Sequence, residues 1–292
     1  MPMVTVIIPT RRRHLLLARA LSSVLAQTHR ELDIIIVDDN EPAQRIQLQA
    51  SLAPLLCDSR IRILPNLGLH SAAGSRNCGL AAAEGDWVTY LDDDDEYRPD
   101  KVRQQLKLAL TTGQSLVLCG AEFHLCGRLR KVQCGTTEWR GDDLILRARW
   151  NTPLLLHRHP GEVRFDESLS PGEDAEFAHH LLLRSGQEEV PVFPSPLVLI
   201  YPQSGERVNT NAEPLLRAAS KILAFRRTSY SRAAKRRYLL QNLLAREKLG
   251  RRLIASTSLA IRLLIESRGK DWRACANAIM TASGLLPGRW VS

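Results

Sequence analysis

The sequence predicts an α/β fold in which a mostly parallel sheet is flanked by helices and followed by a helical C-terminal extension. Up to about residue 121, short apolar runs rich in Val and Ile alternate with segments whose apolar residues recur at helical spacing. This alternation is typical of parallel α/β sheets. Beyond about residue 214 the strand pattern disappears and leucines recur at helical spacing, which predicts two or three amphipathic helices. A chain of 292 residues with 44% hydrophobic residues can bury such a sheet without disulfide support.

The individual elements follow from these patterns in chain order. The expected strands are residues 4–8, which end at Pro9, and then 34–37, 60–64, 87–91 and 115–121. Helices are expected at about 14–26 and 73–83. The stretch 136–204 is rich in proline and predicts irregular structure with one helix over 174–185. We therefore expect a sheet domain over residues 1–204 and a basic helical extension over 205–292.

Polar side chains gather where the expected strands end. Thr10 follows the first strand, Asp38 and Asp39 follow the second, and four consecutive aspartates, Asp92 to Asp95, follow the fourth. Ligands of parallel α/β sheets bind beyond the carboxyl ends of the strands, so these side chains locate the expected site. Adjacent carboxylates repel one another, and a hard cation such as Mg²⁺ or Mn²⁺ shared with a diphosphate would relieve that repulsion. The alternative is a solvated acidic turn that caps the following helix.

Other charged residues near this edge are candidates for ligand binding. Asp38 or Asp39 is suited to accept a hydrogen bond from a base N–H or a ribose hydroxyl. Arg76 and Asn77 lie on the helix expected to point toward the same edge, where Arg76 would pair with Asp39 or contact the base. The arginine run 11–13 would attract a diphosphate. The structural alternatives are a turn or helix cap for the aspartates and a solvated surface for the arginines.

Glu173 and Asp174 open the helix expected over 174–185, directly after Pro171-Gly172. A carboxylate at a helix N-terminus stays ionised because the helix dipole and the free N–H groups favour the anion. Such a carboxylate beside an acceptor hydroxyl is a usable general base. A helix N-cap without a catalytic role is the alternative.

Four segments, taken in order, resemble the family 2 glycosyltransferases, which have the GT-A fold with a Rossmann-like sheet. VTVIIPTRRR is similar to the family's first strand and loop, and SSVLAQTHRELDIIIVDDN to the helix and strand that end on its nucleotide-binding aspartate. SRNCGLAAAEGDWVTYLDDDDEYRPDKV resembles its A-R-N-x-G segment and D-x-D motif, and FDESLSPGEDAEFAHHL its G-E-D segment. The resemblance covers about residues 3–203. It departs from the family at Arg11 and Arg12, where Tyr-Asn is usual.

The resemblance implies a role for each matching residue. Asp92 and Asp94 would form the D-x-D motif, with Asp94 and Asp92 on a Mg²⁺ or Mn²⁺ ion. Asp174 would be the catalytic base, and Glu173 is the first alternative. The residues implied to bind the nucleotide-sugar are Pro9, Thr10, Arg12, Asp39, Arg76, Asn77, Asp92 and Asp93.

The reaction implied by the resemblance is an inverting single displacement. A sugar would move from a nucleoside-diphosphate donor, with a leaning toward UDP, to a hydroxyl of a glycan or lipid-linked acceptor. The implied setting is bacterial surface polysaccharide synthesis.

Two other functions compete with this one. A nucleotidyltransferase on a similar sheet would usually carry a Gly-rich loop after the first strand, whereas Pro9-Thr10 intervene here without glycine. A nucleic-acid binder would interleave aromatic with basic residues, yet residues 240–271 contain no aromatic residue. The sequence therefore favours an enzyme without a nucleic-acid partner.

Charge is unevenly distributed along the chain, whose net charge is +9. Residues 215–292 contain seventeen Lys and Arg against three acidic residues. With leucines at helical spacing, this segment predicts docking on the anionic inner face of the cytoplasmic membrane. Packing on the catalytic domain or a homodimer interface is the alternative. The sequence predicts no signal peptide and no membrane span, and its six scattered cysteines predict free thiols in the cytoplasm.

Overall fold

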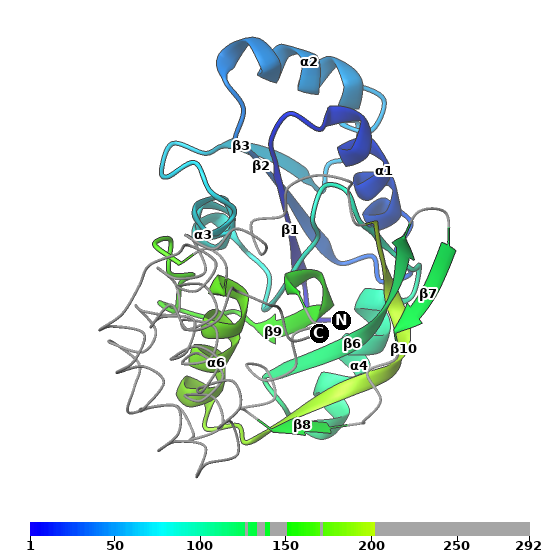
Figure 1. The fold of residues 1–292 in the computed structure, drawn as a ribbon, viewed down its shortest axis with the longest axis vertical. Helices are drawn as coiled ribbons and strands as arrows, with labels where there is room; N and C mark the ends of the chain where they lie inside the picture. The colour runs from blue at the N-terminus through cyan, green and yellow to red at the C-terminus, as the bar shows by residue number, and fades with distance from the viewer. Residues whose placement is uncertain (126–127, 133–137, 141–150, 170–171, 202–292) are drawn as a thin grey trace, which may run out of the picture. The chain divides into compact units, whose positions relative to one another are not determined.

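The structure, a computed structural model, describes residues 1–125, 128–132, 138–140, 151–169 and 172–201 (Figure 1). The expected extension over 205–292, and with it the boundary after residue 204, lies outside the described residues and stays a prediction. Three of the six cysteines also lie outside them. The other three, Cys57, Cys78 and Cys119, form no disulfide among the described residues.

The described residues form a mixed sheet flanked by helices, which confirms the predicted α/β class. The strand order is β3-β2-β1-β4-β9-β6-β10-β5, with β7 beside β6 and β8 beside β10. The strands are β1 (Val4–Thr10), β2 (Leu32–Asp38), β3 (Ile61–Pro65), β4 (Trp87–Tyr90), β5 (Glu96–Tyr97), β6 (Leu116–Leu125), β7 (Arg128–Val132), β8 (Glu138–Arg140), β9 (Leu155–Arg158) and β10 (Glu189–Ile200). The helices are α1 (His14–Leu25), α2 (Pro42–Leu52), α3 (Ala72–Ala82), α4 (Lys101–Thr112) and α6 (Glu173–Ser185), with a 3₁₀ turn η1 (Thr152–Leu154).

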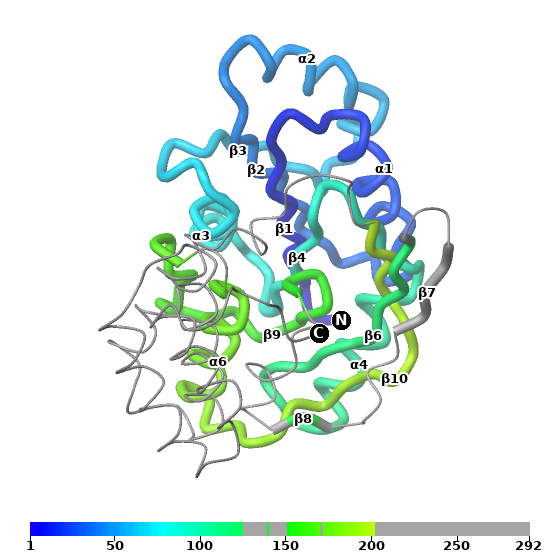
Figure 2. The backbone as a smooth tube through the Cα atoms, viewed as in Figure 1, coloured from blue at the N-terminus to red at the C-terminus, as the bar shows by residue number. Residues whose placement is uncertain are grey.

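The N-terminal strands form the parallel part of the sheet (Figure 2). Strand β1 pairs in parallel with β2 on one side and β4 on the other. Every residue of β2 is buried, as expected of a strand whose two faces are both covered. Helix α3 packs against β1 and β2. Gly79 permits a close approach, because a Cβ there would lie 2.5 Å from Cγ2 of Ile7. This packing fixes the preceding turn of α3, which carries Arg76 and Asn77.

The first strand is longer than predicted, because β1 continues through Pro9 to Thr10. It pairs with β2 as far as Thr10 opposite Asp38, whereas its pairing with β4 stops at Ile7. One side of Pro9 therefore has no strand neighbour, which is the situation in which a sheet tolerates proline.

Within the described part of 136–204, the structure is more regular than predicted: the expected helix is present, and strands appear where irregular structure was expected. This stretch contributes β9, which inserts antiparallel between β4 and β6 and makes the sheet mixed. It also contributes β10, whose pairing with β6 shifts register on both sides of Pro196. Register shifts of this kind let a strand accommodate proline. Three of the prolines that indicated a loop, Pro191, Pro194 and Pro196, therefore lie within a strand.

Two described helices, α2 and α4, have no counterpart among the helix ranges expected from the sequence. In α2 only Leu48 and Leu52 are buried, so little helical periodicity is visible in its sequence. Pro42 stands at its first turn, and proline at that position is a helix-start signal.

Candidate active site

The carboxyl ends of β1, β2 and β4 meet at one edge of the sheet, as the sequence predicts. Thr10 Oγ1, at the end of β1, donates to Asp93 Oδ2 over 2.9 Å. The N–H of Asp39 donates to the Thr10 carbonyl, also over 2.9 Å. One threonine thus ties together the segments that follow β2 and β4.

The four aspartates after β4 fall into two alternating pairs. Asp93 accepts from Thr10, and Asp95 Oδ1 accepts from the N–H of Tyr201 over 2.9 Å. Burial raises the pKa of Asp93 to about 6 and the pKa of Asp95 to about 8. The side chains of Asp92 and Asp94 are 32% and 16% exposed. Asp92 and Asp94 are therefore more accessible to a ligand than Asp93 and Asp95.

Arginines contact this acidic segment. Arg13 Nη1 lies 2.8 Å from Asp94 Oδ2 and 3.2 Å from Asp93 Oδ1. Arg12, which was predicted to bind the nucleotide-sugar, is exposed, and its N–H donates to Asn40 Oδ1 over 2.6 Å. The sequence placed all of 11–13 near a diphosphate but gave no signal for which arginine would face the aspartates. In the structure it is Arg13.

A divalent cation fits these residues only if the substrate supplies part of its coordination. Among the described residues, no three Asp, Glu, His or Cys side chains are grouped as a metal site. A Mg²⁺ ion held by one or two carboxylates and substrate phosphates needs no such group. Asp92 and Asp94 offer hard carboxylate oxygens with partial exposure. The donor set therefore fits a metal shared with a diphosphate and does not fit a closed protein cage.

Arg76 joins the acidic strand end to the start of α6. Its Nη2 donates to Asp92 Oδ1 over 3.1 Å, and its Nη1 donates to Asp174 Oδ1 over 3.2 Å. The Arg76 side chain is 6% exposed. The same oxygen of Asp174 accepts from Thr152 Oγ1 over 2.8 Å. The predicted pairing of Arg76 with Asp39 is therefore replaced by contacts with Asp92 and Asp174. Helix α6 begins at Glu173, as expected.

Asn77 was predicted to bind the donor, but its amide contacts another part of the chain. Its Nδ2 donates to the Phe165 carbonyl over 2.9 Å and to Glu167 Oε1 over 2.8 Å. Its Oδ1 accepts from the N–H of Phe165 over 2.8 Å. Both ends of the Asn77 amide thus contact residues 165 and 167, and the donor-binding role of Asn77 stays a prediction.

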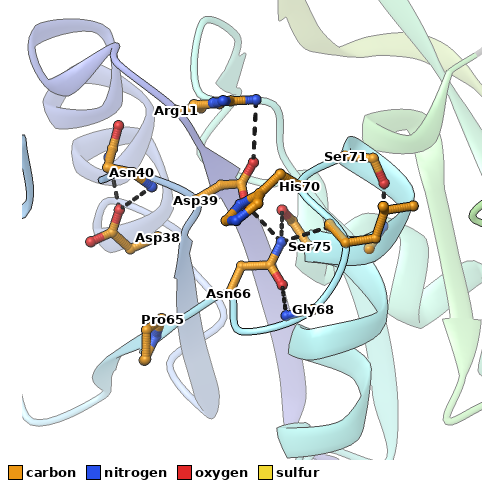
Figure 3. A network of polar contacts seen from close by, with 12 residues as sticks. Arg11, Asp38, Asp39, Asn40, Pro65, Asn66, Gly68, His70, Ser71 and Ser75 are labelled. Carbon is orange, nitrogen blue, oxygen red and sulfur yellow. Dashed lines mark hydrogen bonds and ion pairs between the residues drawn. The ribbon is translucent and has the colours of Figure 1, made fainter. Parts of the chain in front are cut away.

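Asp38, the last residue of β2, and Asp39, which follows it, have different surroundings (Figure 3). Asp38 Oδ1 accepts from the backbone and side-chain N–H groups of Asn40 over 2.9 and 2.7 Å. Asp39 Oδ1 instead contacts Asn66 Nδ2 and His70 Nδ1, both at 2.7 Å. Asn66 and His70 lie in the loop after β3 and were not among the predicted residues. Their position after a third parallel strand is the signal that would have found them, because this strand also ends at the ligand edge.

Comparisons with known proteins found a matching family, similar sequences and a similar fold. The family described as Glycosyl transferase family 2 matches residues 5–166. The "Succinoglycan biosynthesis protein ExoO" of Rhizobium meliloti is 28% identical over 175 residues, which cover 54% of this chain and 49% of that protein. The "GalNAc(5)-diNAcBac-PP-undecaprenol beta-1,3-glucosyltransferase" of Campylobacter jejuni is 38% identical over 97 residues, which cover 33% of this chain and 31% of that protein. The matches thus span half or less of these relatives' length.

Among solved structures, S. aureus TarS 1-349 in complex with UDP-GlcNAc has a similar fold. The TM-score is 0.61 at 17% sequence identity, and the match covers 99% of this chain and 94% of that chain. At this identity the likeness concerns the fold alone.

Proposed function

Because this chain belongs to glycosyl transferase family 2, we propose that it transfers a sugar from a nucleoside-diphosphate donor to an acceptor hydroxyl, with inversion at the anomeric carbon. The observation that carries the proposal is the contact of Arg76 with both Asp92 and Asp174. One buried guanidinium holds a carboxylate of the acidic strand end beside the carboxylate at the start of α6. A single displacement needs a donor-binding group and a base close together, and this contact supports such an arrangement.

The donor diphosphate is proposed to bind at Asp92 and Asp94 with Mg²⁺ or Mn²⁺. When bound, such an ion neutralises negative charge on the leaving diphosphate. Arg13, 2.8 Å from Asp94, supplies a second positive charge at the same place. Thr10 and Asp93 support the site, because their mutual hydrogen bond holds the segment that carries Asp92 and Asp94 against β1.

Asp174 is proposed to remove the proton of the acceptor hydroxyl as its oxygen attacks the anomeric carbon. Thr152 and Arg76 both donate to Oδ1, and no described residue donates to Oδ2. Oδ2 is therefore the oxygen that is open to the acceptor. General-base assistance of this kind contributes roughly 10²–10⁴-fold to the rate. Glu173, the adjacent residue on α6, is the first alternative base.

A thermal-shift panel tests the proposal. UDP, GDP, CDP and ADP are each added with Mn²⁺ or with EDTA, because a ligand that binds only the folded state raises its apparent stability. We expect at least one nucleotide, UDP first, to raise Tm, and to raise it more with Mn²⁺ than with EDTA. If none of the four changes Tm at millimolar concentration, the proposal is wrong.

A glycan or lipid-linked glycan is the proposed acceptor, and one relative is itself named for an undecaprenol-linked acceptor. No helix within the described residues is long and apolar enough to cross a membrane. The segment proposed to dock on the cytoplasmic membrane is the basic segment 215–292, which lies outside the described residues. Liposome sedimentation tests docking: binding should rise with anionic lipid and fall with salt. If there is no binding at low salt, packing on the catalytic domain or a homodimer interface is left for this segment.

A further inference from the structure

The side chain of Asp39 is 6% exposed, and its carboxylate has one oxygen that receives hydrogen bonds from the protein and one that receives none from the described residues. Oδ1 contacts Asn66 Nδ2 and His70 Nδ1, each at 2.7 Å (Figure 3). Oδ2 has its nearest charged neighbour in Arg11, whose Nη1 is 4.0 Å away and whose side chain is 48% exposed. A pair at this distance, with such an exposed arginine, contributes little. No described residue donates a hydrogen bond to Oδ2, so this oxygen can accept from a ligand.

The orientation of Asn66 is determined by its other contacts. Its Oδ1 accepts from the N–H of Gly68 over 3.0 Å, so the atom that faces Asp39 must be the amide nitrogen. Asn66 is 2% exposed, and its Nδ2 also lies 3.0 Å from the Leu69 carbonyl. Buried hydrogen bonds of Asn66 therefore fix its Nδ2 against Asp39.

His70 forms the other side of the contact and is half exposed. An ionised carboxylate only accepts hydrogen bonds, so Nδ1 of His70 carries the proton that is shared with Asp39. The His70 side chain is 51% exposed, and it lies at the end of the loop that begins at Asn66. His70 thus reaches the carboxylate from the solvent side, while Asn66 reaches it from the buried side.

We propose that His70 is a positioning residue for the base of the donor nucleotide. By occupying Oδ1 together with Asn66, it leaves Oδ2 of Asp39 as the oxygen that meets the base. The proposal rests on the proposed function, since it needs a nucleotide donor. A carboxylate oxygen recognises a ring N–H, which uracil and guanine present, whereas the corresponding ring nitrogen of cytosine or adenine has a lone pair. Cytosine and adenine would offer only an exocyclic amino group beside that lone pair, so a uridine or guanosine diphosphate sugar is the expected donor class.

The competing explanation is that the His70 contact only closes the loop after β3. Three variants separate the two explanations. His70→Ala removes the donor, whereas His70→Asn keeps an N–H donor near the place of Nδ1. Leu67→Ala is the matched control, because Leu67 lies in the same loop, is 86% exposed and has no contact with Asp39 among those described.

Calorimetry in the presence of Mn²⁺ supplies the readout. UDP, GDP, CDP and ADP are titrated into the full-length wild type, and the best of them and inorganic pyrophosphate are then titrated into each variant. We expect UDP or GDP to bind best. We expect His70→Ala to weaken that nucleotide roughly 10-fold, near the low end for a hydrogen bond to a charged group, without changing pyrophosphate binding. His70→Asn should recover most of the loss, and Leu67→Ala should bind like the wild type.

The contrary outcomes are distinct. Equal nucleotide affinity in His70→Ala and the wild type overturns the positioning role. A parallel loss of pyrophosphate binding in His70→Ala overturns it as well, because the change would then not depend on the base. A wild-type preference for CDP or ADP overturns the donor class. If the wild type binds no nucleoside diphosphate, the proposed function falls together with this inference. If it binds UDP and His70→Ala is unaffected, only this inference falls.

Discussion

Lys101, at the first position of α4, is fully buried, and this burial predicts a measurable pH dependence of stability. Its Nζ donates to Thr89 Oγ1 and lies 4.2 Å from the centre of the Tyr97 ring. Burial lowers the pKa of Lys101 from 10.5 to about 7. Lys101→Met removes the ammonium group while keeping an unbranched chain of similar length. Thr89 Oγ1 keeps its hydrogen bond to the Leu155 carbonyl at 2.6 Å, so the substitution leaves no unpaired hydroxyl.

The magnitude follows from the two pKa values. Below pH 7 the lysine is protonated in the folded and the unfolded state, so the full cost of burying the charge is present. Between pH 7 and 10.5 the unfolded state binds one more proton than the folded state. The free energy of unfolding therefore rises with pH, by up to about 1.36 kcal/mol per pH unit. Allowing for the tails of both titrations, the wild type should gain about 2.5 kcal/mol relative to Lys101→Met between pH 7.5 and 9.5.

Urea unfolding of both proteins at pH 7.5, 8.5 and 9.5 measures this difference. Titrating groups that both proteins share contribute equally to both free energies of unfolding. The change of the difference between the two free energies with pH therefore reports Lys101. Lys107→Met, an exposed position on the same helix, serves as the control and should follow the wild type. A difference between the wild type and Lys101→Met that stays constant within about 0.5 kcal/mol, the usual limit of such comparisons, would refute the reasoning. The Lys101 ammonium would then reach solvent or an anionic partner in the folded state.

Three further predictions concern the site. Asp174→Asn should reduce turnover by at least ~10²-fold, as expected for loss of a general base, while UDP affinity by calorimetry stays within a few-fold; near-normal turnover would move the role to Glu173. Asp94→Ala should abolish the increase in UDP affinity caused by Mn²⁺, and an unchanged increase in calorimetry would remove Asp94 from the metal site. Arg13→Met should tighten the binding of Mn²⁺ alone by up to about 5-fold, because an exposed ion pair contributes up to about 1 kcal/mol; weaker binding, read by the same titration, would contradict the competition between Arg13 and the metal.

The parts of the fold that were predictable have local signals. The strand β2 is a run of apolar residues buried at every position, and α1 buries Leu17, Leu21 and Val24 at helical spacing. Strands β9 and β10 have no such signal. They belong to the sheet through pairing with segments far away in the chain, β4 and β6, and no local pattern reveals such a partner. The prolines of β10 also argue against a strand unless its register shifts are known.

The same distinction holds for the site. The convergence of Thr10 and the aspartates could be predicted, because the carboxyl ends of parallel strands share one edge. The partners of Arg76 could not, since Asp174 is 98 residues away along the chain. Asn77 matched a family motif, yet motif position does not reveal that its amide is already bonded to residues 165 and 167. Positions along the chain thus indicated which residues lie near the edge, but only the fold determines which of them contact each other.

The arginine contacts change the physical argument for the acidic strand end. From the sequence, a cation was expected to relieve the repulsion among Asp92 to Asp95. In the structure, guanidinium groups of the chain already do so: Arg76 contacts Asp92, and Arg13 contacts Asp94. A divalent ion arriving alone must therefore compete with two ion pairs for the same carboxylates. An ion arriving with a diphosphate brings further oxygen ligands for itself and offers the displaced arginines phosphate oxygens to contact. Metal and nucleotide should consequently each bind more tightly in the presence of the other.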